Sequence, residues 1–427
     1  MKSYLNRPVV LVLRNYLLIR NDHIEAMFQA GLAIHLLTDE KSTLDDPRYA
    51  SVRILAPGAS ADELTEEILI ALKKTGAPFA VTFYEMDIVS VGQANARHGV
   101  TWSRPEADRI ARDKSLQRAH LLAHRLPTPL SIRIGDYSDI DAAMAQVGTP
   151  FVVKPTRGAG SSNVELVDDP KRARELLDEI RGIAHTGAEH FYDNGFPETW
   201  ALIEEYLPGD EITVDGAVID GKFVLAGINT KSFPNPPCFE EDLYVMPFGD
   251  AEAEANVDGL MQRLVQTLDL QTALVNAELR RGADGAFRFV EFSTRISGGH
   301  VYRNIRDVHA VDLVAIFLTA AFGDTEEAME MAGARHPGRV ATCIRFIYRT
   351  GVIEENSAGY ALRHPNFREY YAINGRGDHV WAAPLGFEPI GLLAVRGRYD
   401  PATHPAAIVE TALECEAELN VKLRPFD

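Results

Sequence analysis

Short apolar segments alternate with amphipathic helix patterns along the first hundred residues, and this alternation restricts the fold more than any other feature of the sequence. Strands are predicted over 8–13, 33–37 and 79–83, and helices over 22–30, 64–74 and 89–98. Strands that alternate with helices pair in parallel, and the helices cover the sheet. We therefore expect residues 1–104 to form an N-terminal α/β domain.

This alternation is also typical of dinucleotide-binding domains, but the first turn argues against that function. The turn reads Arg14-Asn15-Tyr16 and contains no glycine. A pyrophosphate is bound by backbone that approaches it closely, which requires glycine at this turn. Asp39, at the end of the second predicted strand, is interpreted as a loop residue rather than as a ribose ligand.

Charge and cysteine content exclude several classes of protein. The 427 residues carry 43 Lys and Arg against 61 Asp and Glu, a formal charge of −18, which argues against non-specific nucleic-acid binding. The 3 cysteines are far apart in sequence, which excludes a disulfide scaffold and a structural zinc site. The longest apolar run, 313–323, is about half a membrane span. We expect a cytoplasmic protein that binds neither nucleic acid nor membrane.

Beyond residue 104 the sequence predicts hairpins mixed with helices. A charged helix is expected over 105–123, a mobile loop over 181–199 and a buried helix over 307–321. From residue 339 the chain reads as a β-rich lobe that ends in a helix over 405–419. Strands are expected over 131–134, 151–154, 164–167, 201–205, 211–219, 222–229, 272–280, 286–295, 343–348 and 391–398.

A lysine and a glycine-rich loop follow one of these strands. Gly158 and Gly160 come soon after Lys154, and Ser161 and Ser162 follow them. Glycines allow positive φ, so successive N–H groups can form a nest for an anion. A plain Gly/Ser turn of a β-hairpin explains the same residues equally well, and the order of lysine and glycines is not that of a Walker loop.

A second segment, Glu204-Glu205-Tyr206-Leu207, runs from a strand into a short linker that Glu211 follows. The linker backbone could hydrogen-bond the edge of an adenine, and Glu211 begins the next strand at a distance suited to a ligand hydroxyl. In isolation, an acidic solvent-exposed loop is the favoured interpretation of these residues.

The strongest signal is a hairpin closed on residues 282–285. In the expected register Glu278 faces Phe289 and Asn276 faces Glu291, so the two acids are diagonal neighbours on one sheet face. Carboxylates that converge on a buried face repel each other unless a cation lies between them. Mg²⁺ that bridges substrate phosphates suits such a site. A solvated, charged face is the alternative, but the flanking phenylalanines imply that both faces are covered.

The same alternation extends this acidic face along the second strand. Ser293 and Arg295 follow Glu291 at intervals of two and are expected on its face. Gly298 and Gly299 then lead towards the next helix and offer backbone donors near Arg295.

The glycine loop, the linker and the hairpin, in this order, resemble the ATP-grasp superfamily. The resemblance implies an α/β (α+β) fold: a Rossmann-like N-terminal domain (1–104), an ATP-grasp domain (105–330) with a lid at about 125–205, and a C-terminal β-rich lobe (331–427). It also implies ATP and Mg²⁺ as cofactors, with Mn²⁺ as a substitute.

The resemblance gives roles to the positions that match the family's motifs. It implies that phosphates are bound by Lys114, Lys154, Gly160, Ser161 and Ser162. It implies that the adenosine is bound by Glu204, Glu205, Tyr206, Leu207 and Glu211. The implied metal ligands are Glu278, Glu291 and Ser293, which replaces the more usual Asn. The implied catalytic groups, which stabilise an acyl phosphate and an oxyanion, are Arg295, Gly298 and Gly299.

Within the superfamily, the one-chain layout is similar to that of L-amino acid ligases, which form dipeptides. Those enzymes carry Glu-x-x-x-Arg at the second metal acid, as Glu291 and Arg295 do here, and a Glu-x-Gly-His-x-x-Pro segment upstream. The corresponding stretch begins with Glu241, has Tyr244 in place of His and ends with Pro247. Glu241, Tyr244 and also His300 are therefore candidate substrate contacts.

The resemblance implies an ATP-dependent carboxylate–amine ligase that acts through an acyl phosphate. Its partners would be small-molecule substrates, a carboxylic acid and an amine, and it is compatible with a homodimer. One alternative is a biotin-carboxylase-like or purine-type carboxylase that uses bicarbonate. A second alternative is a nucleotide-binding protein without catalysis.

Overall fold

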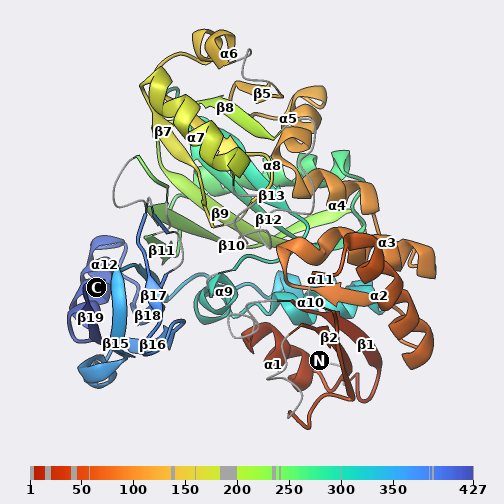
Figure 1. Ribbon diagram of the computed structural model, residues 1–427. Helices are drawn as coiled ribbons and strands as arrows, with labels where there is room; N and C mark the ends of the chain where they lie inside the picture. Colours follow the sequence, from red (N-terminus) through yellow and green to blue (C-terminus); the bar gives the residue numbers. More distant parts are fainter. Residues whose placement is uncertain are drawn as a thin grey trace.

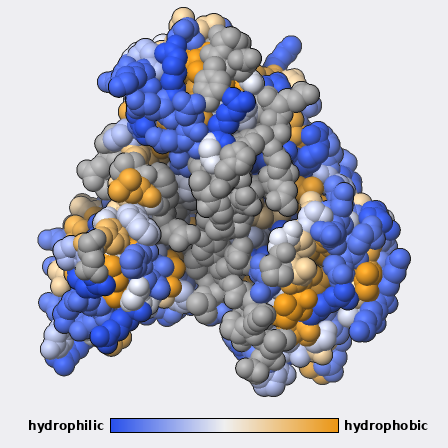
Figure 2. Space-filling view, viewed as in Figure 1, coloured by the Kyte–Doolittle hydropathy of each residue, from blue (hydrophilic) through white to orange (hydrophobic). Residues whose placement is uncertain are grey.

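The fold has three lobes, which Figure 1 shows around a common centre. The computed structural model describes residues 4–14, 21–39, 46–56, 58–135, 140–158, 160–182, 200–232, 237–239, 242–298, 300–383, 385–386 and 389–426. In Figure 2 hydrophilic residues dominate the visible described surface of each lobe, and hydrophobic residues form small separate patches. In the described ranges no helix is both long and apolar enough to cross a membrane.

The N-terminal region confirms the parallel sheet that the alternating sequence predicts. Its strands pair in parallel in the order β3-β2-β1-β4. The elements are β1 (Pro8–Val12), α1 (Asn21–Gln29), β2 (Ala33–Thr38), β3 (Ser51–Ile54), α2 (Ala61–Thr75), β4 (Ala80–Thr82), η3 (Glu85–Asp87) and α3 (Ile88–His98). Strand β3 was not predicted. Its alternating residues are exposed or half-buried at the sheet edge, so it lacks a compact apolar run.

Two helices that were expected to be continuous are each divided in two. An aspartate explains both breaks, because its side chain accepts hydrogen bonds from the first turn of the helix that follows it. Asp113 accepts from the amides of Ser115 and Leu116, and Asp312 accepts from the amide of Ala315. The resulting helices are α4 (Pro105–Arg112), α5 (Lys114–Ala123), α9 (Val301–His309) and α10 (Leu313–Ala321).

The large central sheet has the strand order β13-β12-β9-β10-β11-β14-β18-β16. Its strands are β9 (Glu211–Ile219), β10 (Lys222–Ser232), β11 (Leu243–Met246), β12 (Thr272–Arg281), β13 (Phe287–Ser293), β14 (Val340–Ile347), β16 (Phe367–Ala372) and β18 (Gly391–Arg398). Because β11 pairs with β14, the sheet crosses the domain boundary expected at 330/331. Helices α8 (Ala251–Thr267) and α11 (Thr325–Gly333) also belong to this part of the chain.

The region predicted as the lid, about 125–205, forms a separate sheet with the order β5-β8-β6-β7. Its elements are β5 (Ser131–Ile134), α6 (Ile140–Val147), β6 (Phe151–Pro155), β7 (Glu165–Val167), α7 (Pro170–Gly182) and β8 (Ala201–Glu205). Its buried side chains, among them Phe151, Leu177 and Ile203, form a core of their own. Residues 181 and 182 end α7 rather than begin a loop, and 183–199 of the predicted mobile loop lie outside the described residues.

The C-terminal part adds a small sheet and does not end in a helix as expected. It contains β15 (Gly351–Ser357), η7 (Gly359–Arg363), β17 (His379–Val380), α12 (Ala406–Ala417) and β19 (Asn420–Arg424). Strand β19 follows the predicted helix and pairs with β15.

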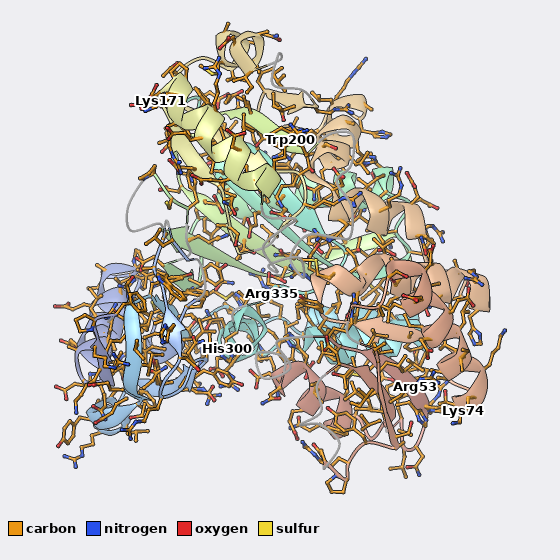
Figure 3. All side chains as sticks on the ribbon, in the orientation of Figure 1. Arg53, Lys74, Lys171, Trp200, His300 and Arg335 are labelled. Atoms are coloured by element: carbon orange, nitrogen blue, oxygen red, sulfur yellow. The ribbon has the colours of Figure 1, made fainter. Side chains whose placement is uncertain are left out.

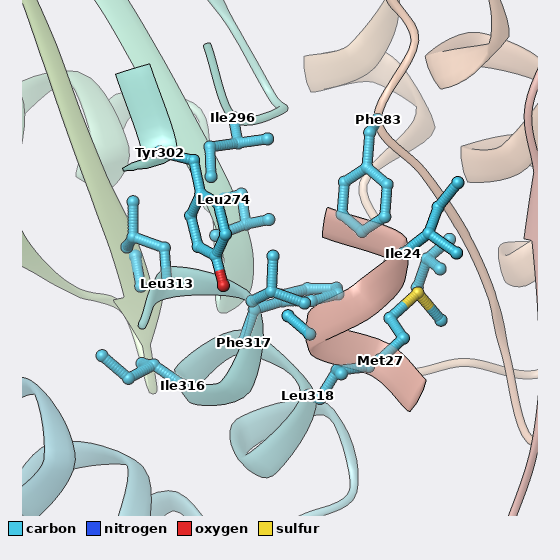
Figure 4. Packing of buried hydrophobic residues seen from close by; sticks show 14 of the residues in the cluster. Ile24, Met27, Phe83, Leu274, Ile296, Tyr302, Leu313, Ile316, Phe317 and Leu318 are labelled. Atoms are coloured by element: carbon cyan, nitrogen blue, oxygen red, sulfur yellow. The ribbon is translucent and has the colours of Figure 1, made fainter. Parts of the chain in front are cut away.

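A large hydrophobic cluster joins the N-terminal region to the centre. In Figure 4, Ile24 and Met27 of α1 lie beside Phe317 and Leu318 of α10. The cluster extends to residues of β11, β14 and β18. Buried apolar area of this kind stabilises the arrangement of the lobes around the centre.

Candidate active site

The two acids predicted to bind metal lie directly opposite each other on the hairpin of β12 and β13. Glu278 pairs with Glu291, so the expected register, in which Glu278 faced Phe289, is wrong. A β-bulge between Glu278 and Leu279 adds one residue to β13. One extra residue exchanges the faces on which the following side chains lie.

The bulge places the acids and the aromatic residues on opposite faces of the hairpin. Phe289 and Phe292 are buried in the core together with Leu279. Glu278 and Glu291 instead line a cavity of about 330 Å³. Without the bulge, Phe289 and Glu291 would share one face. The sequence therefore predicts that these two acids lie close together, as they do, but it predicts the wrong register.

Each of these acids is paired with a lysine. Lys231 Nζ lies 2.9 Å from Glu278 Oε1 and 3.0 Å from Glu211 Oε1, and Lys114 Nζ lies 2.9 Å from Glu291 Oε1. Burial raises the pKa of Glu278 against the opposing charge of Lys231, and repulsion from Glu211 and Glu291 adds to the rise. Burial would also raise the pKa of Glu291, but Lys114, together with Lys154 and Arg295, leaves that pKa below its usual value.

A second charge cluster joins the lid sheet to α5. Glu204 Oε1 accepts from Arg118 Nε at 2.7 Å, and Glu204 Oε2 lies 2.6 Å from Lys154 Nζ. Burial would raise the pKa of Glu204, but the charges of Arg118 and Lys154 hold it at about 2. Burial lowers the pKa of Lys154 to about 8, against the attraction of Glu204. In this structure Glu204 is the anionic partner of Lys154, the lysine predicted to bind phosphate.

Most of the predicted site residues line the same cavity. Those that do are Lys114, Lys154, Gly160, Ser161, Ser162, Glu204, Glu205, Tyr206, Leu207, Glu211, Tyr244, Glu278, Glu291, Ser293, Arg295 and Gly298. In the loop after β6, Gly160 and Ser161 both have positive φ, 63° and 56°. Positive φ at two consecutive residues makes a tight turn, and the binding of an anion by its amides stays a prediction.

Arg295 lies beyond the end of β13 and is held by a carboxylate from the N-terminal region. Its Nε forms an ion pair with Glu85, and Ser293 Oγ donates to the same carboxylate at 2.9 Å. Burial would lower the pKa of Arg295, but Glu85 and Glu291 raise it. The hydroxyl proton of Ser293 is directed to Glu85, so a metal-ligand role for Ser293 stays a prediction.

Among the predicted residues that the structure describes, His300 does not line the cavity. Glu241 and Gly299 lie outside the described residues. His300 is the N-cap residue that precedes α9, on the side of the centre that faces the C-terminal lobe (Figure 3). Its Nδ1 lies 3.5 Å from Asp22 Oδ2 and its ring meets Tyr371 edge-on, and it is not among the cavity-lining residues.

Comparison with known proteins agrees with this geometry. The ATP-grasp domain family matches residues 147–303, which span the lysine–glycine loop, the linker and the hairpin. The crystal structure of L-amino acid ligase from Bacillus licheniformis superposes with a TM-score of 0.81, at 16% identity, over 98% of this chain and 99% of that chain. Residues 147–303 thus match an ATP-grasp domain, and the fold is that of the superposed ligase. The fold class and the family resemblance inferred from the sequence are therefore confirmed.

Two curated relatives are, by name, a ligase and a synthase. Alanine–anticapsin ligase of Bacillus subtilis (strain 168) is 25% identical over 298 residues, which is 66% of this chain and 62% of that protein. Carnosine synthase 1 of Homo sapiens is 29% identical over 237 residues, 53% of this chain and 28% of that protein. The chain thus matches less than two thirds of the length of either relative.

Three charged groups of the candidate site were not found from the sequence. Lys231 pairs with Glu211 in the register of β9 and β10, so correct hairpin pairing could have indicated it. Arg118 and Glu85 reach the site from α5 and from the loop region after β4. Arg118 bonds to Glu204, which is 86 residues away in sequence, and Glu85 bonds to Ser293, which is 208 residues away. No local sequence pattern predicts contacts of this length.

The acid pair fits a divalent cation held jointly with a phosphate. The side chains of Glu278 and Glu291 remain 26% and 30% exposed towards the cavity, although their strands are buried. Among the residues whose placement is described, no cluster of three or more His, Cys, Asp or Glu could hold a metal. Two carboxylates with few further protein ligands suit Mg²⁺, which takes its other ligands from water and substrate phosphates.

Proposed function

We propose that this protein is an ATP-dependent, ADP-forming carboxylate–amine ligase that acts on an amino acid. One observation carries the proposal: two lysines, two opposed carboxylates and an arginine face one cavity. These are Lys114, Lys154, Glu278, Glu291 and Arg295. Phosphoryl transfer depends mainly on charge neutralisation and positioning, and this set supplies both.

The proposed reaction has two steps. A carboxylate oxygen attacks the γ-phosphorus of ATP, the bond to the β,γ-bridging oxygen breaks, and ADP leaves. The amine nitrogen then attacks the carbonyl carbon of the acyl phosphate. The carbon–oxygen bond to the phosphate breaks, phosphate leaves with one former carboxylate oxygen, and the nitrogen loses a proton as the amide forms.

In this proposal the chain's own side chains stabilise the charges. Lys114 and Lys154 attract the phosphates, and the left-handed loop at Gly160 directs amides to them. Mg²⁺, held by Glu278 and Glu291, would supply charge neutralisation on the phosphate oxygens. Arg295 carries a permanent charge and can donate to both the acyl phosphate and the oxyanion of the second step.

The relatives support an amino acid as a substrate. One curated relative is named as a ligase of alanine and anticapsin, and the superposed crystal structure is of an L-amino acid ligase. We propose the same class of reaction here, with small-molecule substrates.

The test is substrate-dependent release of ADP and phosphate across a panel of amino-acid pairs. A ligase releases ADP with an amino acid as the carboxylate, releases more when an amine is added, and forms an amide detectable by mass. A carboxylase depends on bicarbonate and ignores amino acids, and a nucleotide sensor binds ATP without turnover. Either of the latter results contradicts the proposal.

A further inference from the structure

One end of the cavity is lined by apolar side chains. These come from the turn after β4 and from β11, β14, the segment after β16, and β18. We define the apolar wall as Tyr84, Tyr244, Phe346, Ile373 and Leu392. Tyr84, Tyr244, Phe346 and Leu392 are 2–6% exposed and belong to the large hydrophobic cluster, and Ile373 packs against it.

The wall is preorganised by sheet pairing. Phe346 of β14 lies directly opposite Leu392 of β18, and the amide of Phe346 bonds to residue 242, beside Tyr244 of β11. The rings of Tyr244 and Phe346 meet edge-on with centroids 5.0 Å apart. Side chains fixed on adjacent strands form a surface of defined shape, which is what discrimination between substrates requires.

The wall lies next to the groups that would handle the reacting carboxylate. Lys231, which pairs with Glu278, lies 5.5 Å from the ring centroid of Tyr244. At the other side, Tyr84 directly precedes Glu85, which holds Arg295. The region predicted as the lid, about 125–205, lines the cavity with residues that precede β5 or lie on β6, on the loop after β6 and on β8, and it contributes no residue to the wall. A ligand that places a carboxylate at Arg295 would therefore turn its remaining part towards the wall.

The described lining residues between 346 and 392 carry no charge. They are Phe346, Ile373, Pro389 and Leu392. A charged or amide side chain placed there would lose its water without gaining a partner from these residues, at a cost of about 1–3 kcal/mol for an amide. An apolar side chain would instead gain from leaving water.

We propose that the apolar wall binds the side chain of the amino acid whose carboxylate is phosphorylated, and selects an apolar side chain. This inference rests on the proposed ligase function. It names the substrate class of that site: amino acids such as leucine and methionine, in preference to asparagine and glutamine, which have nearly the same size and shape.

Hydroxylamine provides a test that does not require the natural amine. It attacks an acyl phosphate at the carbonyl carbon, displaces phosphate and gives a hydroxamate. The assay contains wild-type protein, ATP and Mg²⁺. We expect kcat/KM for hydroxamate formation from L-leucine to exceed kcat/KM for its formation from L-asparagine by about 10- to 100-fold. The same order is expected for L-methionine over L-glutamine.

Two adjacent leucines of β18 provide matched variants. Leu392 lies in the wall, whereas the side chain of Leu393 is buried in a different cluster on the other face. Leu392→Ala opens space, so we expect the kcat/KM ratio of phenylalanine to leucine to rise about tenfold, since each buried methylene is worth about fourfold. Leu393→Ala should leave the ratio unchanged. The ratio is independent of the fraction of protein that folds.

Phe346→Leu is the second wall variant if Leu392→Ala does not fold, and the same rise in the ratio is expected. Two outcomes would overturn the proposed role of the wall and leave the proposed ligase function intact. One is that hydroxamate forms equally well from asparagine and leucine. The other is that Leu393→Ala shifts the phenylalanine-to-leucine ratio as much as Leu392→Ala does. Absence of ADP release with every amino acid overturns both proposals.

Discussion

Replacement of Glu204 by glutamine is the perturbation whose cost the structure defines best. The carboxylate lies between Arg118 and Lys154, at 2.7 Å and 2.6 Å, and is 4% exposed. These cations hold the pKa of Glu204 at about 2, against an ordinary value of 4.5. The difference corresponds to about 3 kcal/mol at 1.36 kcal/mol per pKa unit. We therefore expect Glu204→Gln to lower the free energy of unfolding by about 3 kcal/mol near pH 7.

The pH dependence of this loss has a definite sign. A carboxyl group with a lowered pKa in the folded state stabilises the protein above its unfolded pKa, near 4.5, and loses that contribution as the pH falls towards about 2. The difference between wild type and Glu204→Gln should therefore be largest at neutral pH and shrink below pH 4.5.

Urea unfolding at several pH values measures this difference, with Glu205→Gln as the control. Glu205 is the next residue of β8, and its carboxylate accepts from the amide of Leu130 at 2.8 Å, a bond that the oxygen of glutamine can also accept. The control should cost less than about 1 kcal/mol. A Glu204→Gln variant as stable as the control, or a loss that is the same at pH 7 and pH 3, would refute the reasoning.

Four further outcomes are expected. Glu278→Gln and Glu291→Gln should each fold normally and lose at least about 10²-fold in turnover, and normal rates at limiting Mg²⁺ would show that they hold no metal. Arg295→Met should bind ATP nearly as wild type does, by calorimetry, but lose amide formation by about 10²–10³-fold. Glu85→Gln removes the ion pair that positions Arg295, so it should lower kcat about tenfold and leave KM for ATP unchanged. An equal change in kcat and in KM for ATP would count against a positioning role. Because the pKa of Lys154 is about 8, kcat/KM for ATP should fall as the pH rises through 8, and Lys154→Arg should abolish that alkaline limb.

Much of the site could be predicted because its residues follow one another on single strands. Glu278, Glu291 and the linker residues are local features of strand and turn, and the structure places all of them on one cavity. The predicted register of the hairpin was wrong because β13 contains a one-residue bulge. Phenylalanines lie on both sides of the bulge, so the sequence pattern does not reveal it.

The helix breaks and the charge partners had different causes. Asp113 lies within a continuous helical pattern, and only its side-chain bonds to the following turn reveal the break. Arg118 meets Glu204 across 86 residues, and Glu85 meets Ser293 across 208. Such contacts depend on how lobes pack, which periodicity along the chain does not encode.

Transfer of oxygen from the acid to phosphate tests the central claim most directly. An amino acid labelled with ¹⁸O in its carboxylate is incubated with the protein, ATP, Mg²⁺ and an amine, and the released phosphate is analysed by mass. An acyl phosphate requires each phosphate molecule to carry one oxygen from the carboxylate, so the account predicts labelled phosphate in step with amide formation. Unlabelled phosphate formed alongside the amide would contradict it.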